Sequence, residues 1–221
     1  MLTYYLIFMP CFFYLERIQK HRLIHASAFE HRGKGIILTG LGGVGKSTLS
    51  LAALLWPENR FLSDNIIFYN DEKIYSLKSP IAADQKIVEQ YEIIKNKLVA
   101  KQFNSHFNRM YYDLKQEFCV DQLMPEYLFW LQQSNVNLII PMKNQNRDRN
   151  IVKINFLTDH LREYYIFAAA FDFILTKDKI LADYLSNLHN FLESINCFIL
   201  KFRPDDELNK IFNETIDKAV N

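Results

Sequence analysis

Glycine is almost absent from this chain outside one short stretch. All six glycines of the 221 residues lie between Gly33 and Gly45. Glycine allows backbone conformations and close approaches that a Cβ would block, so its concentration in one place indicates a backbone that makes contacts there. No glycine follows Gly45, so a second glycine-rich loop is excluded from the rest of the chain.

Cysteine is scarce as well. The chain has three cysteines, Cys11, Cys119 and Cys197, which are odd in number, far apart, and without the spacing of a metal site or a redox pair. This excludes a disulfide framework and fits a reducing compartment, so we expect a cytoplasmic protein.

Neither an excess of one charge nor a long uninterrupted hydrophobic run is present. Lys and Arg number 26 against 25 Asp and Glu, so no global field draws the chain to nucleic acid or to an anionic membrane. The apolar run LTYYLIFMPCFFYL is interrupted by Pro10 and is shorter than a membrane span. We expect no nucleic acid and no membrane as partner, and we interpret this run as a buried, largely helical entry segment.

Hydrophobic residues make up 49% of the chain and aromatic residues 14%, which is ample for a packed interior. We expect one α/β domain over 1–221 with a mixed sheet and flanking helices. Strands are predicted over 23–29, 36–39, 60–69, 136–142, 151–156 and 197–202, with the first two forming a hairpin. Helices are predicted over 47–55, over 180–195, from Pro204 to 219, and with irregular joints through an insert at about 82–135.

Residues 40–47, GLGGVGKS, satisfy the pattern G-x-x-x-x-G-K-[ST] between a predicted strand and a predicted helix, which is the context of a P-loop. Backbone N–H groups of such a loop cradle phosphate oxygens, Lys46 reaches the β- and γ-phosphates, and Ser47 supplies a hydroxyl to Mg²⁺. A glycine-rich turn that matches by chance is the competing interpretation. The predicted nucleotide-binding residues are Gly40, Gly42, Gly43, Val44, Gly45, Lys46, Ser47 and Thr48.

The stretches on either side of the P-loop carry a family resemblance. IHAS at 24–27 precedes the loop, and LSDN at 62–65 follows it. With this order, the region resembles the HPr kinase/phosphorylase and PEP carboxykinase superfamily, and within it the small HPr kinase-related proteins found beside peptide-tailoring genes, lasso-peptide kinases included. The resemblance implies a fold like the HPr kinase C-terminal domain.

The resemblance also implies roles for three residues. Lys46 would act on the phosphates, Asp64 would act as general base toward the substrate hydroxyl and join Ser47 at the metal, and His25 would lie near Asp64. A carboxylate within reach of a hydroxyl can accept its proton, and an imidazole can hold or tune that carboxylate. The alternatives are an aspartate that caps a turn and a core histidine.

This chain departs from the family at three places. Asn65 stands where the family has a second acid, which should weaken the attraction of Mg²⁺. Thr48 stands where the bifunctional enzymes carry Glu, and the glycine-containing signature loop of those enzymes is missing. These departures argue against phosphorolysis and against HPr as the substrate.

Further basic residues are weaker candidates. Lys143, Arg147 and Arg149 lie in a polar stretch and could clamp a phosphate or a substrate carboxylate. Lys97, Lys101 and Arg109 could frame a peptide groove. A solvated loop is the competing interpretation for the first set.

The sequence therefore predicts an ATP- and Mg²⁺-dependent kinase that transfers the γ-phosphoryl group to a hydroxyl, with a serine of a peptide or protein as acceptor. A small-molecule kinase and a nucleotide-binding regulatory module with decayed catalysis are the alternatives. Family members often form oligomers, so the resemblance allows a homo-oligomer, although no interface can be recognised in the sequence.

Overall fold

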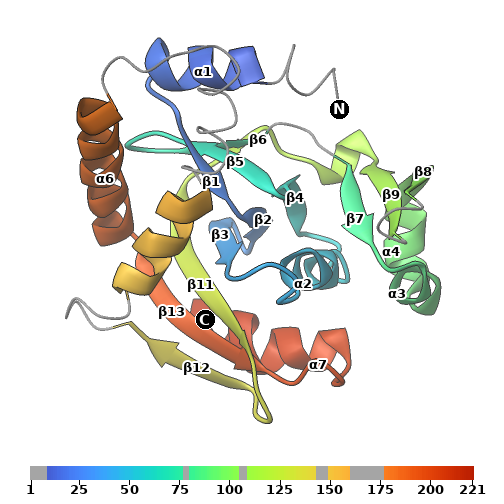
Figure 1. Ribbon diagram of the computed structural model, residues 1–221. Helices are drawn as coiled ribbons and strands as arrows, with labels where there is room; N and C mark the ends of the chain where they lie inside the picture. The colour runs from blue at the N-terminus through green and yellow to red at the C-terminus, as the bar shows by residue number, and fades with distance from the viewer. Residues whose placement is uncertain (1–8, 77–79, 105–108, 143–148, 160–176) are drawn as a thin grey trace.

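A six-stranded mixed sheet forms the centre of the protein (Figure 1). The computed structural model describes residues 9–76, 80–104, 109–142, 149–159 and 177–221. The sheet has the order β12-β13-β11-β3-β2-β4, and its strands are β2 (Ser27–His31), β3 (Lys34–Thr39), β4 (Arg60–Ser63), β11 (Pro125–Gln133), β12 (Leu138–Pro141) and β13 (Asn196–Phe202). The predicted α/β fold with a mixed sheet and flanking helices is confirmed.

Strand directions bring several segments to one edge of this sheet. β3 is parallel to β11 and β13, whereas β2 is antiparallel to both β3 and β4. The ends of β3 and β4 and the beginning of β2 therefore share an edge. The P-loop follows β3 and leads into α2 (Lys46–Ala53), so it lies at the carboxyl ends of the parallel strands, where open α/β sheets bind ligands.

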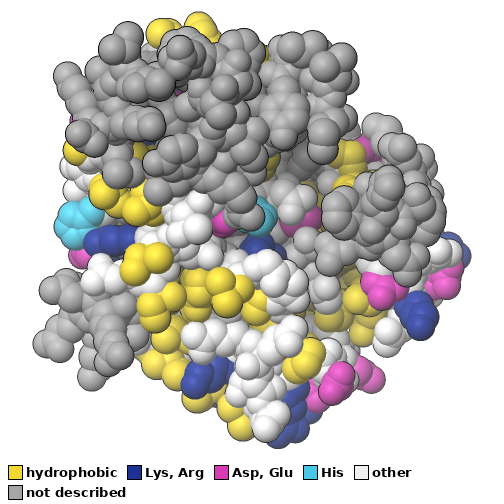
Figure 2. Space-filling model, in the orientation of Figure 1, with side chains coloured by type: hydrophobic (Ala, Val, Ile, Leu, Met, Phe, Trp, Pro, Cys, Tyr) yellow, Lys and Arg dark blue, Asp and Glu magenta, His cyan; other side chains and the backbone are white. Residues whose placement is uncertain are grey.

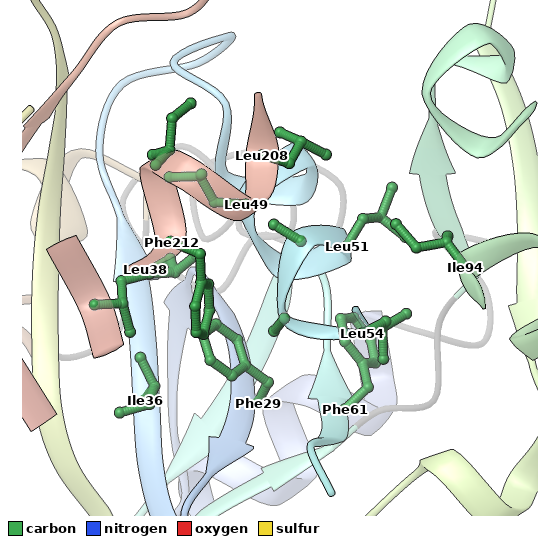
Figure 3. Close-up of a cluster of buried hydrophobic side chains, with 14 of the residues drawn as sticks. Phe29, Ile36, Leu38, Leu49, Leu51, Leu54, Phe61, Ile94, Leu208 and Phe212 are labelled. Carbon is green, nitrogen blue, oxygen red and sulfur yellow. The ribbon is translucent and has the colours of Figure 1, made fainter. Parts of the chain in front are cut away.

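Alternating side chains of β3 divide the core into two layers. Ile36 and Leu38 belong to one buried cluster and Ile37 to the other, and all three are fully buried. The first cluster packs under α2 and α7 (Leu208–Phe212), where Figure 3 shows the rings of Phe29 and Phe212 beside each other. The second packs against α6 (Lys177–Ser194) and a helix over 149–159. Burying each such aliphatic side chain contributes about 1.5–3 kcal/mol, so both layers hold the central strand in place.

The predicted strand over 23–29 is divided at Ala26. β1 (Arg22–His25) belongs to a second sheet, in the order β1-β5-β6-β10, with β5 (Ile66–Tyr69), β6 (Ile74–Ser76) and β10 (Gln122–Leu123). β2 forms the expected hairpin with β3 through Arg32 and Gly33, whose φ angles of 52° and 76° suit a two-residue turn. A further hairpin, through Asn70, joins β5 and β6.

The prediction of a helical insert over 82–135 is wrong for most of its length. Among the described residues of this segment, only α3 (Gln85–Gln90), α4 (Glu92–Lys97) and a 3₁₀ turn (Gln116–Phe118) are helical. A three-stranded sheet contains β7 (Ile81–Ala83), β9 (Arg109–Leu114) and β8 (Leu98–Asn104), and β11 follows in the central sheet. The Lys- and Gln-rich composition favours helices locally, but strand pairing and packing override that preference.

Two further predictions near the C-terminus are corrected. Residues 151–156 were expected as a strand but belong to the helix over 149–159. Pro204 does not begin a helix: it lies in a turn in which the Asp206 N–H donates to the Arg203 carbonyl, and α7 begins only at Leu208. Pro fits the second position of such a turn because its φ is fixed. The predicted helix at 180–195 and strand at 197–202 correspond to α6 and β13 and are confirmed.

The C-terminal chain continues from α7 through a π-helical turn (Asn213–Asp217) into α8 (Lys218–Val220). At the other end, α1 (Met9–Arg17) is helical as expected, but Tyr14 is 52% exposed, so this helix is less buried than predicted. The first eight residues lie outside the described part. Over the described residues, we find no helix that combines the length and the apolar character needed to cross a bilayer.

Candidate functional site

The loop over 40–47 has the backbone that its glycines predict. Gly40 and Gly43 have φ angles of 146° and 77°, a region that side chains with a Cβ rarely adopt. A Cβ on Gly40 would also lie 3.0 Å from the Leu131 carbonyl oxygen of the neighbouring strand. Gly42 and Gly43 have open space where a Cβ would stand. The loop therefore leaves room for a ligand to approach its backbone at the N-terminus of α2.

Lys46 is held inside this loop. Its side chain is buried, and Nζ donates hydrogen bonds to the carbonyl oxygens of Gly40 at 2.9 Å and Leu41 at 3.3 Å. Burial lowers the pKa of the ammonium group, and the nearby carboxylates of Asp159 and Asp64 oppose this shift. A cation thus lies among loop backbone groups, where it could neutralise phosphate charge.

Ser47 and Asp64 are joined directly. The Ser47 hydroxyl is 3.0 Å from Oδ1 and 2.8 Å from Oδ2 of Asp64, and the Ser27 hydroxyl also donates to Oδ1. Asp64 follows β4 and is fully buried. A hydroxyl that donates its hydrogen to a carboxylate keeps its lone pairs for a cation, so Ser47 fits the role of a Mg²⁺ ligand supported by Asp64.

The next residue, Asn65, differs from Asp64 in its environment. It is exposed, has a φ of 72°, and its carbonyl oxygen accepts a hydrogen bond from the Ala26 N–H at 3.2 Å. Asn tolerates this left-handed conformation better than most residues do. The resulting turn directs the Asp64 carboxylate inward and leaves Asn65 at the surface of the site.

His25 is at the same edge but pairs with an aspartate that the sequence analysis missed. Its position opposite Ile66 in the β1–β5 register places it beside the Asp64–Asn65 turn, as the resemblance implies. Its Nδ1 atom, however, is 3.1 Å from Oδ2 of Asp159, at the end of the helix over 149–159. The buried residues Val152, Phe156 and Asp159 are spaced four and three apart, a helical period that could have revealed this face.

A cavity of about 810 Å³ connects these groups. The P-loop forms one wall, and α3 with the adjoining β7 and β9 forms the other. Figure 2 shows histidine, basic and acidic side chains gathered near the centre of this face. The lining residues are His25, Gly42, Gly43, Gly45, Lys46, Ser47, Thr48, Asn65, Ala82, Asp84, Gln85, Lys86, Ile87, Glu89 and Met110. The predicted residues Gly40, Val44 and Asp64 are absent from this lining, and the wall formed by α3 had not been expected.

The two basic candidates whose side chains the structure describes, Arg149 and Lys97, do not line the cavity. Arg149 donates to the Leu192 carbonyl at 2.8 Å and pairs with Glu193 at 2.9 Å, so it fastens the helix over 149–159 to α6. Lys97 is buried and donates to the Leu54 and Trp56 carbonyls at 2.7 and 3.2 Å, where it caps the end of α2. Lys143 and Arg147 lie outside the described residues, as do the side chains of Lys101 and Arg109.

No protein-family model matches the sequence, and no curated protein matches it. Among solved structures, the chain is similar to the HPr(Ser) kinase/phosphatase from Coxiella burnetii, with a TM-score of 0.40 and 15% identity. The alignment covers 90% of this chain and 95% of that chain. A likeness at this level does not by itself identify a function.

Proposed function

We propose that this protein is an ATP- and Mg²⁺-dependent kinase that transfers the γ-phosphoryl group to a hydroxyl, with a serine of a peptide or protein as the acceptor. The observation that carries the proposal is the joined set of Lys46 within the P-loop and Ser47 bonded to Asp64, beside a cavity of about 810 Å³. That volume is within the range of small-ligand sites, and it leaves space next to the loop for an acceptor.

Different groups of the chain would bind the phosphates and hold the metal. Amides of the P-loop and the N-terminus of α2 would bind the phosphates, and Lys46 would stabilise charge on them by exchanging its carbonyl partners for phosphate oxygens. Ser47 would hold the metal, oriented by Asp64. Bound Mg²⁺ supplies neutralisation of phosphate charge. The family resemblance assigns proton abstraction to Asp64, and the peptide or protein acceptor also comes from that resemblance.

Phosphoryl transfer can be tested directly with an extract of the source cells. The protein is incubated with γ-labelled ATP, Mg²⁺ and the extract, and macromolecular and small labelled products are separated. Lys46→Ala and Asp64→Asn should each lower labelling at least about 10²-fold while the fold is retained. Lys95→Ala, an exposed lysine on α4 outside the cavity, is the matched control and should label as the wild type does. Full activity in Lys46→Ala or Asp64→Asn would contradict the proposal.

The products also separate the alternatives. Label in a peptide or protein supports the stated acceptor, whereas label confined to a small metabolite supports a small-molecule kinase. The regulatory module is favoured by one observation: Asn65, not a second carboxylate, lines the cavity. ATP binding without any turnover across a panel of divalent metals would support that second candidate.

A further inference from the structure

The pair formed by His25 and Asp159 fixes the hydrogen on one ring nitrogen. A carboxylate only accepts hydrogen bonds, so the Nδ1 atom that lies 3.1 Å from Asp159 Oδ2 must carry the hydrogen. In the neutral imidazole, Nε2 is then a bare acceptor. Within the described residues, Nε2 has no hydrogen-bond partner, and the ring lines the cavity with one third of its side chain exposed.

The pair lies close to the place where phosphates are expected. Asp159 is near enough to Lys46 to oppose the effect of burial on that ammonium group, and His25 and Lys46 line the same cavity. Asp159 itself is largely buried, and the Asn155 amide Nδ2 approaches its Oδ2 atom at 3.4 Å. The carboxylate is therefore held within the protein, while the imidazole that it orients faces the ligand space.

Asp64, unlike His25, has its side-chain acceptor atoms bonded to neighbouring hydroxyls. Both of its oxygens accept hydroxyl hydrogens, from Ser47 on both atoms and from Ser27 on one, and the carboxylate is fully buried outside the cavity lining. With these contacts, the Asp64 carboxylate can orient the Ser47 hydroxyl. Asp64 is not among the residues that line the cavity, whereas the ring of His25 is, so the imidazole is the base at the cavity wall.

We infer that His25 accepts the proton of the acceptor hydroxyl, with Asp159 as the positioning residue that holds the hydrogen of the neutral imidazole on Nδ1 and fixes the ring at the cavity wall. The inference rests on the proposed kinase function. As the hydroxyl oxygen forms its bond to the γ-phosphorus, the bond from that phosphorus to the bridging oxygen of ATP breaks and ADP leaves. The hydroxyl proton passes to Nε2, and the imidazolium, stabilised by the Asp159 carboxylate, then releases it to solvent.

The first test is spectroscopic and needs no substrate. Long-range ¹H–¹⁵N spectra of the full chain distinguish imidazoles with the hydrogen on Nδ1 from those with the hydrogen on Nε2, and a His25→Gln sample assigns the His25 signals. The wild type should show the hydrogen on Nδ1. In Asp159→Asn that population should fall, because an amide can also donate to Nδ1. A wild-type His25 with the hydrogen on Nε2 would overturn the inference.

The second test is kinetic and uses γ-labelled ATP with a fixed amount of the same extract. Asp159→Asn should lower the apparent maximal rate by about 10–10³-fold, because orientation of a catalytic base contributes on this scale, while the KM for ATP stays within about twofold. Asp159→Glu keeps a carboxylate and should recover part of the rate. Asp183→Asn, an exposed aspartate on α6, is the matched control and should leave the rate unchanged.

The outcomes separate this inference from the proposed function. Label transfer by the wild type together with an undiminished rate in Asp159→Asn would overturn the role of Asp159 and leave the kinase intact. A wild type that binds ATP but transfers no label would overturn the kinase, and with it the catalytic step. Equal losses in kcat and in ATP affinity, with the fold intact, would make Asp159 part of the nucleotide site and contradict a positioning role.

Discussion

His25 and His31, six residues apart in the sequence, each pair with an aspartate, and they differ in what the second ring nitrogen does. His25 bonds Asp159 through Nδ1, and its ring lines a cavity. His31 bonds Asp217 through Nε2 at 2.8 Å and Asn59 through Nδ1 at 2.9 Å, and its side chain is completely buried. His25 ends β1, two residues before β2 begins, and His31 is the last residue of β2, so the two histidines lie near opposite ends of that strand.

The comparison shows that a histidine–aspartate pair is not in itself a sign of catalysis. His31 lies against the rings of Phe212 at 5.0 Å and Trp56 at 6.4 Å, so both nitrogens and the ring faces are used to join α2, the β2–β3 hairpin and the C-terminal helical segment. Among the described residues, His25 bonds through Nδ1 alone and leaves Nε2 without a hydrogen-bond partner. The free nitrogen, rather than the pair, distinguishes a group that can react from one that holds the fold together.

The largest expected effect is on activity, from His25→Gln. Glutamine keeps a polar side chain but cannot accept and release a proton near neutral pH, so the maximal rate should fall about 10²–10⁴-fold. The thermal unfolding midpoint should change little, since the side chain is partly exposed. Rates of labelled phosphoryl transfer and thermal unfolding curves measure the two quantities. His189 is an exposed histidine on α6, and His189→Gln is the control. Equal activities in the two variants would contradict a catalytic role for His25.

The second largest effect is on stability, from His31→Ala. This change opens a cavity beside Phe212 and leaves the buried Asn59 Oδ1 atom without its partner, so the free energy of unfolding should fall by about 2–4 kcal/mol. Phosphoryl transfer per folded molecule should be unchanged. Urea unfolding at equilibrium measures the first quantity. His189→Ala should change stability by less than about 0.5 kcal/mol, and a similarly small change in His31→Ala would show that the buried network does not stabilise the fold.

The sequence predicts the position of the glycine loop between a strand and a helix because those elements are local. The glycine positions, Lys46 and Ser47 are set by one strand, one turn and one helix, and the Asp64 turn follows on the next strand at the same edge. Asp159 could not be placed in this way. It is 134 residues from His25, and the six residues 151–156 alternate well enough to suggest a strand unless the helical spacing is followed as far as Asp159.

The middle of the chain shows a second limit of structure prediction from sequence. Tyr127 to Leu131 in β11 form a continuous apolar run that pairs with β3 on one side and β13 on the other. A strand buried on both faces has no polar alternation, so its periodicity does not distinguish it from a buried helix. Only the parallel partners, which are distant in sequence, decide between the two.

A smaller effect is expected from Asp217→Asn. The amide keeps an oxygen for His31 but removes the charge that also pairs with Arg32 at 2.9 Å. Hydrogen bonds to charged groups are stronger than those between neutral groups, so the free energy of unfolding should fall by about 1–2 kcal/mol. This loss should be smaller at high salt, where the exposed part of the interaction is screened. Urea unfolding at low and high ionic strength tests this, with Asp205→Asn as an exposed control. A loss as large as that of His31→Ala would mean that the charge, and not the packing of the ring, dominates this pair.

The smallest effect is expected from Arg32→Asn. This substitution tests the exposed ion pair next to His31 separately from the buried hydrogen bonds of His31. Arg32 is half exposed and pairs with Asp217, and such surface ion pairs contribute at most about 1 kcal/mol. Its φ of 52° precedes Gly33 at 76°, and Asn-Gly is the sequence that this turn prefers, so the substitution removes an ion pair and relieves backbone strain at once. The two effects oppose each other, and unfolding free energy should stay within about 0.5 kcal/mol of the wild type. A loss above about 1.5 kcal/mol would place Arg32 inside the cooperative network with His31, whereas a gain would show that the turn conformation limits stability more than the ion pair supports it.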